Sequence, residues 1–114
     1  MVKALAYVPE RGDIVWIDMD PQAGHEQVGR RPAVVVSPGF YNRASNLALV
    51  CPITSQVKGY PFEIPIPEGI PVIGVVLADQ VKSMDWRARK AKFICRLSDA
   101  CVQRTIATIS RLLG

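Results

Sequence analysis

The 114-residue sequence is poor in the side chains that build metal sites and disulfide frameworks. It has one histidine, His25, and three cysteines, Cys51, Cys95 and Cys101, with no C-x-x-C pair among them. An odd number of cysteines without paired spacing does not indicate a disulfide framework, and His25 lies far along the chain from every cysteine. We therefore expect no metal and no cofactor. The cysteines are expected to act as small apolar residues in a reducing compartment.

Long apolar runs and targeting signals are also missing. No run approaches the roughly 18 to 20 apolar residues of a membrane span, and no N-terminal stretch has the pattern of a signal peptide. Hydrophobic residues make up 49% of the chain and charged residues 21%, which is typical of a globular protein. We expect a single cytoplasmic domain over residues 1–114. The net charge of +4 mildly favours a polyanionic partner.

Short apolar runs separated by glycine and proline predict a β-rich fold. The prolines of residues 61–67 indicate an edge strand, and the continuous apolar run at 32–37 indicates a strand buried on both faces. A mixed stretch over 79–97 has room for one or two further strands, whereas residues 19–31 and 38–46 have the composition of loops. The predicted strands before that mixed stretch are residues 13–18, 32–37, 47–54, 61–67 and 72–78.

The last segment has the pattern of an amphipathic helix. Ser98 is a suitable N-cap, and Asp99 places a carboxylate in the first turn, where it suits the helix dipole. Apolar residues then recur at helical spacing from Val102 to Leu113. The chain is therefore predicted to form a small twisted antiparallel sheet or half-open barrel with a C-terminal helix packed against it. Exposed sheet edges in so short a chain favour a dimer.

One loop, GHEQVGRRP at residues 24–32, concentrates charges of both signs. His25, Glu26, Arg30 and Arg31 lie there between two apolar runs. A simple connector needs turn residues rather than charge. From the residues alone, Glu26 and Arg31 form either a salt bridge within the loop or a pair that acts on a substrate.

Seven short motifs give the chain a family resemblance. In order they are GDIVW, G-x-E-Q-x-G-x-RPA, VSP, YN, PIT, KGYPFE and ADQVKS-x-DWR, and they extend over roughly residues 7 to 89. Together they resemble the MazF family of toxins, also called PemK-like. The resemblance implies an SH3-like barrel of the CcdB/PemK type with a C-terminal helix, in a homodimer. It also implies a metal-independent endoribonuclease that cuts single-stranded RNA at short words and stops translation, and a cognate acidic antitoxin that blocks the RNA groove.

The resemblance also implies catalytic residues. The acid, the arginine and the threonine of the family fall on Glu26, Arg31 and Thr54. Metal-free RNA cleavage needs a base for the 2′-hydroxyl, and an ionised glutamate suits that role. Arg31 suits the phosphate oxygens, and Thr54 has a hydroxyl to donate to the same phosphate. His25 is our hypothesis for the proton donor to the leaving oxygen; the alternative is a surface loop residue.

A wider RNA surface is predicted from loop and motif residues. The amide of Gln80 and the carboxylate of Asp79 suit base edges, and cations suit phosphates. For the lysines and arginines the alternative is a solvated face. Trp16 and Trp86 are expected in the core or at an interface, with stacking on RNA as the alternative. The predicted RNA contacts are His25, Arg30, Lys58, Asp79, Gln80, Lys82, Arg87 and Arg89.

Two other functions remain open on the sequence. CcdB toxins resemble this fold, yet they bind and poison DNA gyrase instead of cutting RNA. The second alternative is a catalytically inactive RNA-binding regulator. A gyrase poison does not need the set of Glu26, Arg31 and Thr54. Because one fold can support several activities, the choice depends on these site residues.

Overall fold

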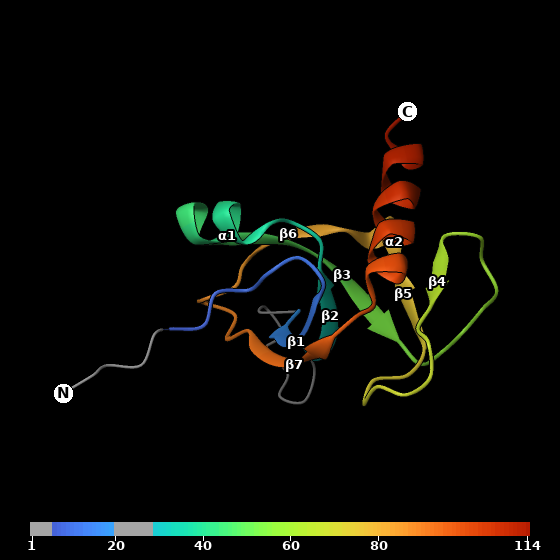
Figure 1. The fold of residues 1–114 in the computed structure, drawn as a ribbon, viewed down its shortest axis with the longest axis horizontal. Coiled ribbons are helices and arrows are strands. Elements are labelled where there is room, and N and C mark those ends of the chain that lie inside the picture. The colour runs from blue at the N-terminus through green and yellow to red at the C-terminus, as the bar shows by residue number, and fades with distance from the viewer. Residues whose placement is uncertain (1–5, 20–28) are drawn as a thin grey trace.

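The computed structural model describes residues 6–19 and 29–114. Within them lie seven strands, two α-helices and one short 3₁₀ helix (Figure 1). The strands are β1 (Asp13–Asp18), β2 (Arg30–Val35), β3 (Leu47–Thr54), β4 (Glu63–Pro65), β5 (Val75–Leu77), β6 (Lys82–Asp85) and β7 (Lys92–Arg96). The helices are α1 (Gly39–Ser45), η1 (Ala78–Gln80) and α2 (Asp99–Leu112). This architecture confirms the predicted fold class, mostly β with a C-terminal helix.

All strand pairs are antiparallel, and β3 joins them into one sheet. The order is β4-β5-β3-β2-β1-β7, and β6 also pairs with β3. The first half of β3 pairs with β6 and its last two residues pair with β5, while β2 runs along its other side. Pro52, which has no N–H to donate, falls at the changeover between β6 and β5. The strand predicted from residues 61–67 is β4, and it lies at the edge of the sheet as expected.

The central strands β1, β2 and β3 are buried on both faces. Alternate residues of β2 enter two separate cores, with Val34 in one and Ala33 and Val35 in the other. The core that includes Val34 is covered by α2 through residues such as Val102. The opposite core is closed by Trp86, as expected of a core tryptophan. Two-sided burial explains why the sequence of β2 is continuously apolar instead of alternating.

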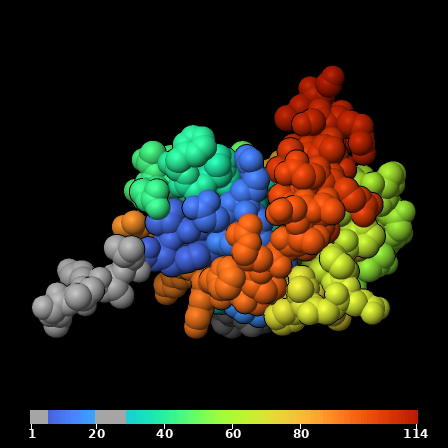
Figure 2. All heavy atoms as spheres, in the orientation of Figure 1, coloured from blue at the N-terminus to red at the C-terminus, as the bar shows by residue number. Residues whose placement is uncertain are grey.

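The C-terminal helix α2 begins at the predicted cap. The Ser98 side chain accepts a hydrogen bond from the Cys101 backbone N–H at 3.3 Å. Val102 is buried, whereas Leu113 is largely exposed, so the apolar stripe is covered only in its first half. The last turn of α2 extends beyond the body of the molecule (Figure 2). In the described ranges, no helix is both long and apolar enough to cross a bilayer.

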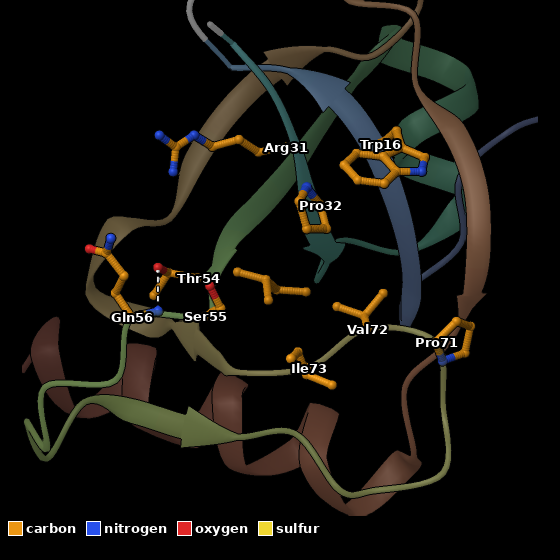
Figure 3. Close-up of a pocket in the computed structure, with 10 residues that line it drawn as sticks. Trp16, Arg31, Pro32, Thr54, Ser55, Gln56, Pro71, Val72 and Ile73 are labelled. Atoms are coloured by element: carbon orange, nitrogen blue, oxygen red, sulfur yellow. Dashed lines mark hydrogen bonds between the residues drawn. The ribbon is translucent and has the colours of Figure 1, made fainter.

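Three predicted strands have different bounds in the structure, and two of the differences shape the site. The strand predicted at 61–67 is shorter, because β4 covers only Glu63–Pro65. β2 begins at Arg30 instead of Pro32, because the hairpin pairing with β1 continues to Asp18 and Arg30. The strand predicted at 72–78 is reduced to β5, because Gly74 has a φ of 116° that breaks the extended conformation. The residues before Gly74 form instead one wall of a surface hollow (Figure 3).

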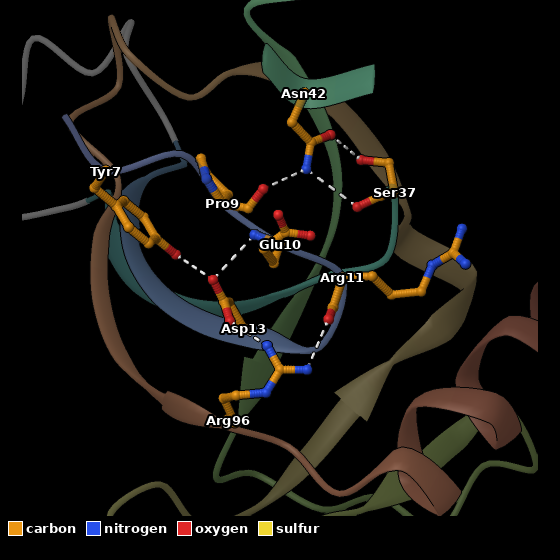
Figure 4. Close-up of polar contacts among 8 residues, drawn as sticks. All are labelled: Tyr7, Pro9, Glu10, Arg11, Asp13, Ser37, Asn42 and Arg96. Carbon is orange, nitrogen blue, oxygen red and sulfur yellow. Dashed lines mark hydrogen bonds and ion pairs between the residues drawn. The ribbon is translucent and has the colours of Figure 1, made fainter. Parts of the chain in front are cut away.

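The prediction of a loop at residues 38–46 is wrong, because this segment contains α1. Asn42, in the middle of α1, is fully buried and ties the helix to the rest of the fold (Figure 4). Its amide donates to the carbonyls of Pro9, at 2.7 Å, and Ser37, at 3.1 Å, and its side-chain oxygen accepts from the Ser37 hydroxyl at 2.6 Å. Its backbone carbonyl accepts from the indole N–H of Trp86 at 3.0 Å.

We predict that Asn42→Ala lowers the free energy of unfolding by about 2 kcal/mol, because it leaves two buried carbonyls and a hydroxyl without their partner. The measurement is urea denaturation followed by circular dichroism. Arg43→Ala, on the exposed side of the same helix, is the control and is expected to change stability little. Equal stability of the two variants would contradict the role given to Asn42.

Candidate functional site

A surface hollow of about 440 Å³ lies where β2 begins and β3 ends (Figure 3). Arg31 and Thr54, two of the three predicted catalytic residues, both line it. Arg31 is exposed and Thr54 is half-buried. The other residues that line this hollow are Trp16, Pro32, Ile53, Ser55, Gln56, Pro71, Val72 and Ile73.

The pairing of β2 with β3 brings Arg31 and Thr54 together. Ala33 lies opposite Pro52 in this antiparallel pair. The same register, continued by two residues, places Arg31 across from Thr54, and a step of two keeps both side chains on one face. A cation and a hydroxyl donor therefore share one hollow, an arrangement suited to a phosphate group.

A second hollow of about 240 Å³ adjoins the first. Thr54 and Gln56 line both hollows, so they form the ridge between them. Lys58, Asp79 and Gln80, three of the predicted RNA contacts, line the second hollow. The structure thus brings together a hydroxyl, an ammonium group, a carboxylate and amides from segments that are distant in sequence. This mixture of donors and acceptors suits the polar edge of a nucleobase.

Glu63 holds the loop that forms one wall of the second hollow. Its side chain is only 8% exposed and faces the Lys58–Tyr60 loop. Both carboxylate oxygens accept from the Lys58 backbone N–H at 3.2 Å, and one accepts from the Gly59 N–H at 2.9 Å. These bonds satisfy a buried charge with backbone donors, which fixes the course of the loop.

Cys51 lies in the core beneath this region and is not a reactive thiol. Burial, and to a smaller extent the negative charge of Asp79, raises the pKa of Cys51 to about 12. Because the thiolate is the reactive form, Cys51 is inert at neutral pH. Burial also raises the pKa of Cys95 and of Cys101. All three cysteines are free thiols.

Arg30, next to Arg31 at the start of β2, and Arg89, in the turn before β7, face Asp18 at the end of β1 and not the two hollows. Arg30 forms an ion pair with the Asp18 carboxylate at 3.4 Å and donates to the Lys90 carbonyl at 3.3 Å. Arg89 donates to the backbone carbonyl of Asp18 at 3.0 Å. Within residues 6–19 and 29–114, neither arginine lines the two hollows described above. Their guanidinium groups hold the turn before β7 against the β1–β2 hairpin.

Arg87 and Lys82 are also exposed but belong to another part of the surface. The Arg87 guanidinium lies 5.2 Å from the centre of the Trp86 ring, which favours a cation–π contact. Lys82 lies on β6 opposite Val50 of β3. In the described part of the chain, neither residue lines the hollows that contain Thr54.

Two predicted site residues, His25 and Glu26, lie outside the described residues. They belong to the segment that joins β1 to β2. The ends of that segment meet where the Met19 backbone N–H donates to the Gly29 carbonyl at 2.6 Å. Glu26 is therefore separated by only a few residues from the strand that carries Arg31.

Sequence reasoning missed the apolar side of the first hollow. Trp16 is not a core residue in this chain, because it is 41% exposed and lines the hollow. Ile73, which is 75% exposed, and Pro71 form the opposite wall. An exposed isoleucine has no signature in a sequence, and Gly74 was the one available sign that the run before β5 leaves the sheet.

Comparisons with known proteins find a matching family and similar full-length proteins. A family described as "PemK-like, MazF-like toxin of type II toxin-antitoxin system" matches residues 10–113. The endoribonuclease toxin MazF of Escherichia coli K12 is 48% identical over 108 residues, which cover 95% of this chain and 96% of that protein.

Solved structures are also similar to the chain. The crystal structure of MazF from Deinococcus radiodurans has a TM-score of 0.88 and 47% identity, and covers 96% of this chain and 99% of its own. A MazE–MazF structure from the same organism has a TM-score of 0.85 and 40% identity, with coverage of 96% and 98%.

We predict that Glu63→Gln speeds hydrogen exchange of the Lys58 and Gly59 amides by about tenfold, because the substitution places an NH₂ group against backbone donors and weakens the loop contacts. The measurement is residue-resolved amide exchange by NMR. Glu68→Gln, at an exposed carboxylate in the neighbouring loop, is the control. Unchanged exchange at both amides in Glu63→Gln would show that the carboxylate does not hold the loop.

Proposed function

The chain belongs to the PemK-like, MazF-like toxins of type II toxin–antitoxin systems, and from that premise we propose that it is a sequence-specific endoribonuclease. The substrate is single-stranded RNA, the setting is the cytoplasm, and residues 1–114 form one toxin domain. The observation that carries the proposal is the shared hollow of Arg31 and Thr54. Its relatives named MazF, PemK and ChpB are all described as endoribonucleases.

The proposed reaction needs no metal or other cofactor. Glu26 takes the proton of the 2′-hydroxyl, whose oxygen attacks the adjacent phosphorus. The bond from phosphorus to the 5′-oxygen breaks as the new bond forms, which leaves a 2′,3′-cyclic phosphate and a 5′-hydroxyl. A water molecule or His25 supplies the proton to the leaving oxygen.

Arg31 and Thr54 stabilise the charge that develops on the phosphate. The planar guanidinium fits two phosphate oxygens, and the Thr54 hydroxyl is a further donor on the same side of the hollow. Arginine loses its proton only above about pH 12, so Arg31 acts as an electrostatic group and not as the general acid. Pro32 biases Arg31 toward the extended backbone of β2, which limits where its side chain can project.

The second hollow is the proposed base-reading part of the site. Gln80 and Asp79 offer an amide and a carboxylate to a base edge, and Lys58 offers a cation to a neighbouring phosphate. Lys82, Arg87, Arg30 and Arg89 would contact only RNA that extends beyond the two hollows. They therefore contribute to affinity for longer RNA and not to the cleavage step.

A cognate acidic antitoxin is the proposed inhibitor. The chain carries a net charge of +4, and complementary charge favours association. The Deinococcus radiodurans structures named above include a MazE–MazF complex. The alternative of a CcdB-like gyrase poison is not favoured, since the matching relatives are named endoribonucleases. The shared hollow of Arg31 and Thr54, which a gyrase poison does not need, supports the same choice.

A homodimer is the proposed assembly. An apolar hollow of about 440 Å³ between α1, β3 and α2 is lined by Phe40, Tyr41, Leu49, Ile106 and Ile109, among others. The first three of these side chains are exposed. A contiguous apolar surface of this kind is typical of a protein–protein contact.

The decisive prediction concerns cleavage of a long single-stranded RNA in EDTA. We expect cuts at one short word, with cyclic phosphate ends identified by sequencing and end-group analysis. Glu26→Ala is expected to lower kcat by roughly 10²- to 10⁴-fold, as for loss of a general base. Arg31→Ala is expected to lower it by roughly 10²- to 10³-fold, as for loss of one charge-stabilising donor.

Val57→Ala, at an exposed residue outside the two hollows, is the control variant for cleavage. Folded wild-type protein that cuts no RNA would refute the proposed function. Activity that EDTA abolishes and magnesium restores would refute the metal-free mechanism alone.

We predict that Leu49→Glu converts the dimer to monomer, because a carboxylate in an apolar contact loses its hydration without gaining a partner. Light scattering after size-exclusion chromatography measures the mass. Val57→Glu adds the same charge at another exposed apolar residue and should leave the mass unchanged. Dimeric Leu49→Glu would place the subunit contact on a different face.

A further inference from the structure

Gly74 makes an unusually close approach to Thr54. A Cβ atom at position 74 would overlap the Thr54 carbonyl oxygen, and it would lie 2.8 Å from the Thr54 carbonyl carbon and 3.0 Å from Ser55 Cα. Real Cβ atoms are essentially never this close to backbone, and backbone cannot swing away as a side-chain end can. The φ of 116° at Gly74 is also one that residues with a Cβ rarely adopt.

The contact connects the two walls of the first hollow. Gly74 follows the wall segment 71–73, and Thr54 ends the strand on the other side. Val75, the next residue, pairs with Thr54 in the sheet, and the Gly74 carbonyl accepts from the Ile66 N–H at 3.0 Å. The backbone at position 74 is thus fixed from two sides and lies directly on the backbone of Thr54.

We propose that Gly74 is a positioning residue for Thr54: the absence of a side chain at position 74 lets the 71–74 segment lie against β3 and fixes where the Thr54 hydroxyl points. Gly74 itself contacts no substrate. The inference rests on the proposed function for its catalytic readout. The expected displacement of Thr54 by a side chain at position 74 follows from the contact alone and does not depend on the activity.

The test compares Gly74→Ala with Gly69→Ala. Gly69 lies in the same loop and has a similar φ of 103°, but a Cβ there meets nothing within 4 Å. Both variants therefore carry the cost of alanine at positive φ, and only Gly74→Ala pushes on Thr54. With a short RNA that contains the word mapped for wild type, Gly74→Ala is expected to lower kcat by about tenfold with KM little changed. Gly69→Ala should keep kcat within about twofold of wild type.

A double-mutant cycle separates positioning from general destabilisation. In a Thr54→Ala background, Gly74→Ala should lower kcat by no more than about twofold, because its effect passes through the missing hydroxyl. The loss of stability, measured by urea denaturation, should be the same in both backgrounds. Thr54 amide and methyl NMR signals should shift in Gly74→Ala and stay in place in Gly69→Ala, and this readout needs no catalysis.

An equal loss of kcat in the two backgrounds, or unshifted Thr54 signals, would overturn the proposal. If Gly74→Ala does not fold, a glycine inserted between Ile73 and Gly74 replaces it, because this change relaxes the segment without adding an atom against Thr54. The insertion should lower kcat in wild type and not in Thr54→Ala, and an unchanged kcat would overturn the proposal. Inactivity of the wild type would instead refute the endoribonuclease assignment, with the NMR comparison still deciding the Gly74 contact.

Discussion

The fold and the site both depend on the hydrogen-bonded ladder of β3. This strand pairs with β2 along one side and with β6 and then β5 along the other, so it is the strand that three neighbours share. Its interior residues are buried in two cores, which leaves little freedom to shift its register. A slip of one residue would move Thr54 away from Arg31 and exchange the side chains of β3 between the two cores. The same burial that stabilises the protein therefore fixes the chemistry at the end of the strand.

The site combines residues held by strands with walls formed by loops. Arg31 and Thr54 are placed by neighbouring strands, where backbone pairing determines position. The walls around them include loops that depend on one side chain, such as the Lys58–Tyr60 loop, whose backbone N–H groups donate three hydrogen bonds to the Glu63 carboxylate. Chemistry on strands and recognition on loops is a common division in enzymes. In the proposed function, this division would let base recognition change while the phosphate contacts stay the same.

Local signals predicted much of this structure and failed where contacts between distant segments decide it. Strand β1 and helix α2 were predictable because apolar spacing and the Ser98 cap are local features. Helix α1 was not, because its stability comes from Asn42 reaching Pro9 and Ser37. For the site, the residues alone left open whether Arg31 pairs with Glu26 or acts on a substrate, and the family resemblance favoured the second. Nothing local marked Gly74, since its neighbour in space is twenty residues away.

The two tryptophans give the protein separate optical reporters of folding and of occupancy. Trp86 is 4% exposed and its indole N–H is bonded inside the core, so its emission is that of a tryptophan in an apolar environment until the chain unfolds. Trp16 lines the first hollow opposite Pro32 and is partly in contact with solvent. A molecule that fills the hollow would remove that solvent and change the emission of Trp16 alone. A single intrinsic fluorescence spectrum can therefore distinguish an occupied site from a loosened core without any added label.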